Sequence, residues 1–128
     1  MENLKIGTEG YLEKIVEYKD TAISYGSGLI EVFATPAMIG LMEMTAQLSV
    51  QGLLPEGYTT VGTEVNIKHI KASLVGEKVY AKTVLLEIDG KKLVFEVAAF
   101  DTKAQIGLGT HTRFIVHKEG FMEKTKSL

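Results

Sequence analysis

Three polar side chains stand in apolar stretches of this sequence, and their types could support acid–base or nucleophilic chemistry. Glu43 lies inside the apolar run 36–54, Thr35 directly precedes that run, and His69 falls on the apolar face of a stretch with a two-residue period. A carboxylate in an apolar groove is a common arrangement for a general base or a water-orienting group. An imidazole transfers protons near neutral pH, and a hydroxyl beside a base can act as a nucleophile.

Each of these residues also has a purely structural explanation. Glu43 could lie on a narrow exposed stripe of a helix together with Gln47 and Gln51. His69 could be a hydrogen-bonded core histidine, and the Thr35 hydroxyl could cap the start of a helix. The free N–H groups at such a helix start would also suit an anion or a developing oxyanion. The residue types alone leave both explanations open.

The helices and strands that must position these residues can be predicted from the spacing of apolar residues along the sequence. The pair Thr35-Pro36 is typical of a helix start, and Gly52 and Pro55 are typical of a helix end, so we expect a helix from about Pro36 to Leu53. This helix is apolar nearly all round, which predicts burial on more than one side. Its small residues let another backbone or a ligand approach closely: Ala37, Gly40 and Ala46.

After residue 58 the period becomes two, which predicts strands. The expected strands cover residues 60–72, 78–88, 93–101 and 106–116, and Asp89-Gly90 predicts a tight hairpin between the second and third. In the first strand one face carries Val61, Val65, Ile67 and His69. In the last strand Ile106, Leu108, Phe114 and Val116 share one face, and Gly107, Gly109, His111 and Arg113 share the other.

The ends of the chain are less regular. Residues 15–25 could form an edge strand, 29–33 a second short strand, and the polar tail 118–128 is expected to be frayed. One long helix with one or two strands before it and four after it predicts an α+β fold, in which an antiparallel sheet of about five to six strands wraps around the helix. The excess of apolar faces predicts a homodimer that joins two sheets edge to edge.

The amino-acid composition and net charge exclude several classes of function. The 128 residues are 45% hydrophobic, which predicts a single domain over 1–128, and the net charge of −2 with dispersed basic residues argues against nucleic acid or an anionic membrane as partner. Cysteine is absent, which excludes thiol nucleophiles and disulfides and agrees with a cytoplasmic location. We find no signal peptide, membrane helix, phosphate-binding glycine motif or nucleophile elbow, and the three histidines lack metal-ligand spacing.

Four stretches form a constellation: VFATPAMIGLMEMTAQ, TTVGTEVNIKHIKASLVGEKVYAKTVL, DGKKLVFEVAAFD and IGLGTHTRFIV. Together they resemble the fluoroacetyl-CoA thioesterase-like family of hot-dog proteins over nearly the whole chain. In that family a threonine at the start of the central helix, a glutamate eight residues on and a histidine in the following strand form the catalytic set. The matching residues here are Thr35, Glu43 and His69, and Gly62 matches the family's oxyanion-side backbone position.

The resemblance implies a hot-dog enzyme that hydrolyses a short or medium acyl-CoA thioester to the free acid and CoA. No cofactor is implied, because CoA enters as part of the substrate. The Gly62 N–H would stabilise the oxyanion, Glu43 and His69 are candidates for the base, and Thr35 would be a nucleophile or a positioning hydroxyl.

The resemblance is incomplete around the acyl group. In the fluoroacetyl-specific enzyme, aromatic residues six and nine positions before the threonine help close the pocket, and the matching residues here are Leu29 and Gly26. We therefore do not expect fluoroacetyl selectivity. Cations that could meet the phosphates of CoA are Lys68, Lys71 and Arg113.

Helix geometry limits how these residues can meet. Eight residues along a helix span about 12 Å, so Thr35 and Glu43 should not touch within one chain. This separation predicts a site assembled across a dimer interface. Two other functions stay open: a non-catalytic acyl-CoA binding or regulatory dimer, and a hot-dog hydratase or dehydratase acting on acyl-CoA.

Overall fold

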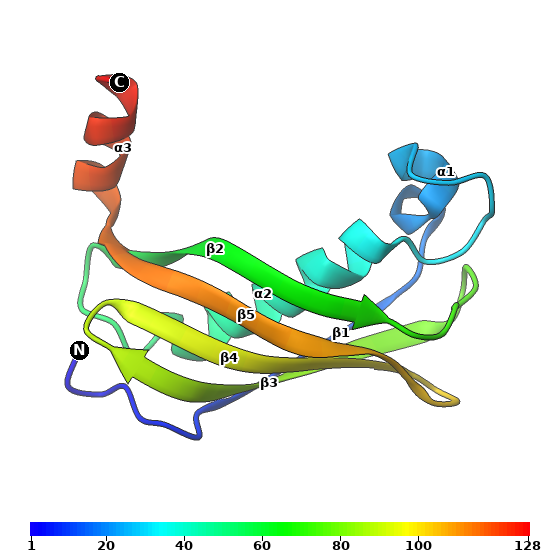
Figure 1. Ribbon diagram of the computed structural model, residues 1–128, viewed down its shortest axis with the longest axis horizontal. Helices are drawn as coiled ribbons and strands as arrows, with labels where there is room; N and C mark the ends of the chain where they lie inside the picture. Colours follow the sequence, from blue (N-terminus) through cyan, green and yellow to red (C-terminus); the bar gives the residue numbers. More distant parts are fainter.

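Five antiparallel strands form one sheet that curves around a central helix in the computed structural model, which describes residues 1–128 (Figure 1). The strands are β1 (Glu9–Ile15), β2 (Tyr58–His69), β3 (Lys78–Asp89), β4 (Lys92–Asp101) and β5 (Gln105–His117). Their order in the sheet is β1-β3-β4-β5-β2, so β1 and β2 are its edges. The helices are α1 (Ala22–Tyr25), α2 (Thr35–Gln51) and α3 (Lys118–Lys126), with a 3-10 turn η1 (Tyr18–Asp20). The predicted α+β architecture is confirmed.

Helix α2 packs across one face of the sheet and forms the core with it. Its buried residues include Met38, Leu41, Met42, Ala46 and Val50, which meet buried residues of β3, β4 and β5 such as Leu85, Phe95 and Ile115. Gly10 of β1 permits the close approach, because a Cβ added there would lie only 2.9 Å from the carbonyl oxygen of Thr45. The helix is therefore fixed against the strands that carry the polar residues.

The start and the far side of α2 differ from the prediction. Ala34, not Thr35, occupies the N-cap position, and no side chain caps the helix. On the side of α2 away from the sheet, Met44 and Leu48 remain 55% and 54% exposed. The predicted burial on more than one side is thus not reached within a single chain.

A β-bulge rearranges the faces of β2. The register with β5 shifts between Gly62 and Glu64, so the strand changes the side to which its alternate residues point. Val61 pairs with Phe114 on the outer face, whereas Gly62 faces α2 in common with His69. The predicted shared face was wrong for Val61, because simple alternation cannot anticipate an inserted residue.

Strand β5 turns its polar face toward the helix. His111 and Arg113 are buried, and a Cβ on Gly107 would clash with the Met38 side chain. Ile106 was placed on the opposite face by alternation, yet it is fully buried in the core. A register shift between β4 and β5 near Ala99 explains this difference.

The regions before α2 and after β5 depart most from the prediction. The predicted edge strand over 15–25 is wrong: β1 ends at Ile15, and the Thr21 hydroxyl accepts a hydrogen bond from the backbone N–H of Ser24 and starts α1, which ends at Gly26 with φ +76°. Residues 29–33 contribute only isolated bridges instead of the predicted strand.

The tail is helical rather than frayed, since His117 caps α3 by accepting from the backbone N–H of Gly120. In Figure 1, α3 projects from the end of β5 and α1 lies at the other end of the sheet. None of the helices combines the length and apolarity needed to cross a membrane. The predicted hairpin is confirmed, with Asp89 paired to Lys92 and Gly90 at φ +60°.

Candidate active site

The first part of the site is a hydrogen-bonded pair formed by Thr35 and His69. The Oγ1 atom of Thr35, at the start of α2, lies 2.8 Å from Nδ1 of His69, at the end of β2. Both residues line a hollow of about 380 Å³ between the segment that precedes α2 and the residues that follow β2. This is the arrangement of a hydroxyl beside a general base.

The surroundings of His69 keep its ring neutral. Burial lowers the pKa of His69, although the backbone of Lys71 acts in the opposite direction. The Nε2 atom is buried and has no hydrogen-bond partner within the chain. If Nδ1 accepts a hydrogen bond from the Thr35 hydroxyl, Nε2 must carry the ring proton. The Nε2–H group is then a hydrogen-bond donor without an acceptor in this chain.

The second part of the site surrounds Gly62, at the bulge of β2. A Cβ placed on Gly62 would lie 3.1 Å from Cε1 of His111, 3.2 Å from Oε2 of Glu43 and 3.3 Å from Nη1 of Arg113. A side chain at position 62 would therefore require at least one of these groups to shift by a few tenths of an ångström. Glu43, Gly62 and Arg113 line an open hollow of about 480 Å³.

Arg113 is a buried cation with a fixed orientation. Its Nε donates to Oγ1 of Thr60 at 2.7 Å, its Nη2 donates to the carbonyl oxygen of Thr60 at 2.9 Å, and its Nη1 lies 3.1 Å from Nε2 of His111. Burial lowers the pKa of Arg113, and the charge of Glu43 opposes this shift. A positive charge is therefore held beside the carboxylate of Glu43 and the backbone of Gly62.

The two parts are separate within one chain. Thr35 and Glu43 are eight residues apart on α2, about 12 Å along the axis. Gly62 and His69 are seven residues apart on β2, roughly 20 Å along the strand. The structure thus brings Thr35 to His69 and Glu43 to Gly62, but it does not bring the two pairs together.

Sequence reasoning did not identify His111 as part of the site. The signal was present, because strand alternation places His111 and Arg113 on one face of β5, where both are buried and approach Gly62. Of the cations considered for CoA, Arg113 is buried and Lys71 binds Asp101, which leaves Lys68 exposed. No group of three His, Asp or Glu side chains could hold a metal ion.

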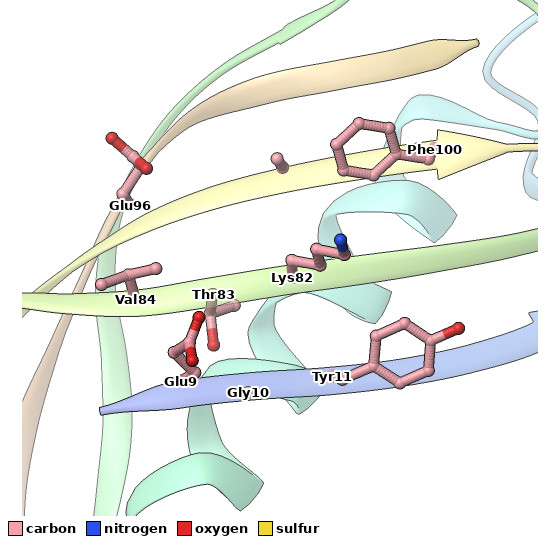
Figure 2. Close-up of a pocket in the computed structure, with 9 residues that line it drawn as sticks. Glu9, Gly10, Tyr11, Lys82, Thr83, Val84, Glu96 and Phe100 are labelled. Atoms are coloured by element: carbon pink, nitrogen blue, oxygen red, sulfur yellow. The ribbon is translucent and has the colours of Figure 1, made fainter. Parts of the chain in front are cut away.

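A third hollow, of about 460 Å³, lies on the outer face of β1, β3 and β4. Figure 2 shows Tyr11, Lys82 and Phe100 around it, with α2 behind the strands. The hollow contains no hydroxyl–imidazole pair, and it lies on the side of the sheet opposite to Thr35. It is not the candidate active site.

Comparison with known proteins identifies the family of this chain. The model of a family described as fluoroacetyl-CoA-specific thioesterase matches residues 16–119. A fluoroacetyl-CoA thioesterase from Streptantibioticus cattleyicolor is 35% identical over 96 residues, which cover 75% of this chain and 69% of the relative.

Solved structures show the same fold. The fluoroacetyl-CoA thioesterase FlK superposes with a TM-score of 0.90 at 29% identity, over 97% of this chain and 96% of FlK. A hot-dog-like protein from Thermanaerovibrio acidaminovorans superposes with a TM-score of 0.89 at 22% identity, over 98% and 93% of the two chains, and shows the fold alone. The chain therefore belongs to the fluoroacetyl-CoA-specific thioesterase family and has the hot-dog fold of its relatives.

Proposed function

We propose that the protein hydrolyses short or medium acyl-CoA thioesters to the free acid and CoA, at sites shared between two copies of the chain. The observation that carries this proposal is the 2.8 Å contact between the Thr35 hydroxyl and Nδ1 of His69, in a chain of a thioesterase family. A hydroxyl that donates to a neutral imidazole is prepared for attack on a carbonyl carbon.

The free edge of β2 supports the shared site. β2 pairs with β5 on one side only, and Val65 near its middle is 42% exposed. Because Thr63 is the extra residue of the bulge, Gly62 and His69 each lie three ladder positions from Asn66 along β2. A twofold axis at this point would therefore pair β2 with its symmetry copy and set Gly62 opposite His69 of the partner subunit.

Such a dimer would complete two equivalent sites. Each site takes Thr35 and His69 from one subunit, and Glu43 and Gly62 from the other. The exposed Met44 of α2 lies on the same open side as Glu43, where a second helix would cover it. The unpartnered Nε2 of His69 would then face groups of the second subunit or a water molecule held there.

In the first chemical step the Thr35 oxygen bonds to the thioester carbonyl carbon while its proton passes to Nδ1 of His69. The carbonyl oxygen gains negative charge and is stabilised by the Gly62 N–H of the partner subunit. The carbon–sulfur bond then breaks, and the departing CoA sulfur takes the proton from His69. An acyl-threonine and CoA result.

In the second step a water molecule releases the acid. The carboxylate of Glu43 of the partner subunit accepts a hydrogen bond from this water and orients it toward the acyl carbon. His69 takes the other proton of the water as the new carbon–oxygen bond forms, and returns it to the Thr35 oxygen when the acyl–threonine bond breaks. Glu43 thus orients water in this scheme, and His69 is the base.

The acyl group is not restricted to fluoroacetyl in this proposal. Gly26 has no side chain and ends α1, and Leu29 is an aliphatic side chain that is 95% exposed. Neither residue supplies an aromatic cover over Thr35. CoA enters the site as part of the substrate, and the reaction needs no other cofactor.

The test is release of free thiol from a panel of acyl-CoA thioesters, with Thr35→Ala, Glu43→Gln and His69→Ala beside the natural protein. We expect thiol release by the natural protein and its loss in all three variants. Matched controls are His117→Ala and Glu56→Gln, because both residues are exposed and outside the two hollows. Absence of release from every thioester would favour a binding dimer, and hydration of enoyl-CoA would favour a hydratase.

A further inference from the structure

His111 of β5 is a buried imidazole with a partner at each ring nitrogen. Only 1% of the residue is exposed, Nδ1 lies 2.8 Å from the carbonyl oxygen of Glu64, and Nε2 lies 3.1 Å from Nη1 of Arg113. A carbonyl oxygen can only accept and a guanidinium can only donate. Both contacts are satisfied only by a neutral ring that carries its proton on Nδ1.

The two contacts of His111 are made to groups on either side of Gly62. Glu64 is the residue at which the β2 register resumes after the bulge, so its carbonyl oxygen fixes one end of the bulge. Arg113 is the residue of β5 that pairs with Gly62. His111 thus joins the bulge and the cation that flank the backbone of Gly62.

We propose that His111 is a positioning residue, which in its neutral form holds the Glu64 carbonyl and the Arg113 guanidinium so that Gly62 and Arg113 face the substrate carbonyl. The inference rests on the proposed thioesterase function and deepens it. His111 itself touches no reacting atom in this scheme, and it acts through Arg113 and the bulge.

Protonation would undo this arrangement. A second ring proton would place an N–H of His111 against the N–H of Arg113 and add a positive charge beside the guanidinium. Two charged groups lie near the ring: Arg113 on its own strand and Glu43 on α2. The neighbouring strands add no charge to the ring's surroundings. β4 contributes Phe95, and β2 contributes the backbone carbonyl of Glu64, whose residue is otherwise exposed.

The neutral ring is the favoured state at neutral pH. Burial lowers the pKa of His111 and the charge of Arg113 lowers it further, against the opposing influence of the Glu64 carbonyl and the Glu43 charge. The contact with Arg113 therefore persists at neutral pH and is lost in acid.

Two substitutions separate the two contacts. His111→Gln places an amide oxygen near the position of Nε2 and can still accept from Arg113, whereas His111→Asn places an amide N–H near Nδ1 and keeps only the bond to Glu64. We expect kcat to fall by less than about threefold in His111→Gln and by at least about tenfold in His111→Asn, with KM changed by less than about threefold in both. Equal kcat values in the two variants would overturn the proposal, because a merely structural role predicts no such difference.

The pH profile supplies a second readout. His69 and His111 must both be neutral, so we expect the loss of activity in acid to depend on one proton fewer in His111→Gln than in the natural protein. The control His117→Gln, at an exposed histidine, should keep the dependence of the natural protein. An acid limb of the same steepness in His111→Gln and the natural protein contradicts the proposal.

A spectroscopic readout distinguishes failure of this inference from failure of the proposed function. If the natural protein released no thiol, the proposed function would fail, but the nitrogen-15 chemical shifts of the His111 ring would still report its protonation. We expect the Nδ1–H tautomer at pH 7. A Nε2–H tautomer or a charged ring would overturn the positioning role whatever the activity.

Discussion

The hydroxyl of Thr35 lies 2.8 Å from Nδ1 of His69, although 34 positions separate the two residues in the sequence. A threonine at a helix start commonly caps the helix, but Ala34 holds the cap position and leaves the Thr35 hydroxyl free for the imidazole. The contact joins the start of α2 to the end of β2. It is the one direct hydrogen bond between two of the residues matched to the family's catalytic set.

Replacing the Thr35 hydroxyl tests its role as nucleophile. We expect Thr35→Val to lower kcat roughly 10²–10⁴-fold, the range over which positioned proton transfer contributes to catalysis. Thr35→Ser should retain most activity because it keeps the oxygen beside His69. Both variants should keep the unfolding temperature within a few degrees, since Thr35 is exposed.

The intermediate gives a direct measurement. Rapid acid quenching followed by peptide mass analysis should find an acyl group on Thr35 in the natural protein, and more of it in Glu43→Gln, where water is poorly oriented. An active protein that never accumulates the acylated peptide in either form would favour direct attack by water, with Thr35 as a positioning hydroxyl.

Mixed dimers test whether the site spans two subunits. Thr35→Ala and Glu43→Gln should each be inactive alone. After the two are unfolded together and refolded, half of the dimers should be mixed, and each should hold one intact site and one doubly altered site. We therefore expect about a quarter of the natural activity to return, from the statistics of a twofold assembly.

The same experiment has a clear negative result. If Thr35 and Glu43 of one chain served one site, every site in the mixture would carry a substitution and no activity would return. A mixture of Thr35→Ala and His69→Ala is the matched control, because these residues contribute to the same site from the same subunit. Every site in that mixture carries one of the two substitutions, so we expect no activity to return.

Much of the fold could be predicted because it is set by local patterns. The run after Thr35 is apolar at helical spacing, and strand alternation with Asp89-Gly90 specifies β3 and β4. The resemblance, now confirmed by the family comparison, added the pairing of Thr35 with Glu43 and His69 as a set. Their separation along α2 was also predictable, since it follows from helix rise alone.

The remaining features depend on contacts between distant segments. The bulge after Gly62 is visible only in the register with β5, and it decides that Gly62 rather than Val61 faces α2. The capping bond from Gly120 to His117 orders a tail whose composition is polar. The role proposed for His111 depends on its contacts with Arg113 and Glu64, and neither of these residues stands out from composition.

Adding a methyl group at Gly62 tests the crowding around this backbone. A Cβ would lie 3.2 Å from Oε2 of Glu43 and 3.3 Å from Nη1 of Arg113, so Gly62→Ala must displace one of them. We expect kcat to fall at least about tenfold, within the range seen when an oxyanion donor is disturbed. Gly52→Ala is the matched control, because nothing lies within 4 Å of the added atom. Equal rates for the two variants would show that the backbone at position 62 has no part in the reaction.

Asp101 ties the segment after His69 to the turn between β4 and β5. Its carboxylate accepts hydrogen bonds from Nζ of Lys71, from Oγ of Ser73 at 3.0 Å, and from the backbone N–H groups of Lys103 and Ala104 at 2.8 and 2.9 Å. Burial by itself would raise the pKa of Asp101, but the hydrogen bonds outweigh it and hold the pKa well below its usual range.

This carboxylate should make stability depend on pH in a defined direction. Because the pKa of Asp101 is lower in the folded state, its contribution is full above the unfolded pKa of about 3.9 and is lost as the pH falls toward the folded value. We expect Asp101→Asn to lower the free energy of unfolding by about 1–3 kcal/mol at pH 7, the range for hydrogen bonds to a charged group. The difference from the natural protein should shrink between roughly pH 4 and pH 2, measured by urea unfolding at one protein concentration. Glu56→Gln, at an exposed loop position, should show no such dependence, and a difference for Asp101→Asn that stays constant over this range would contradict the assignment.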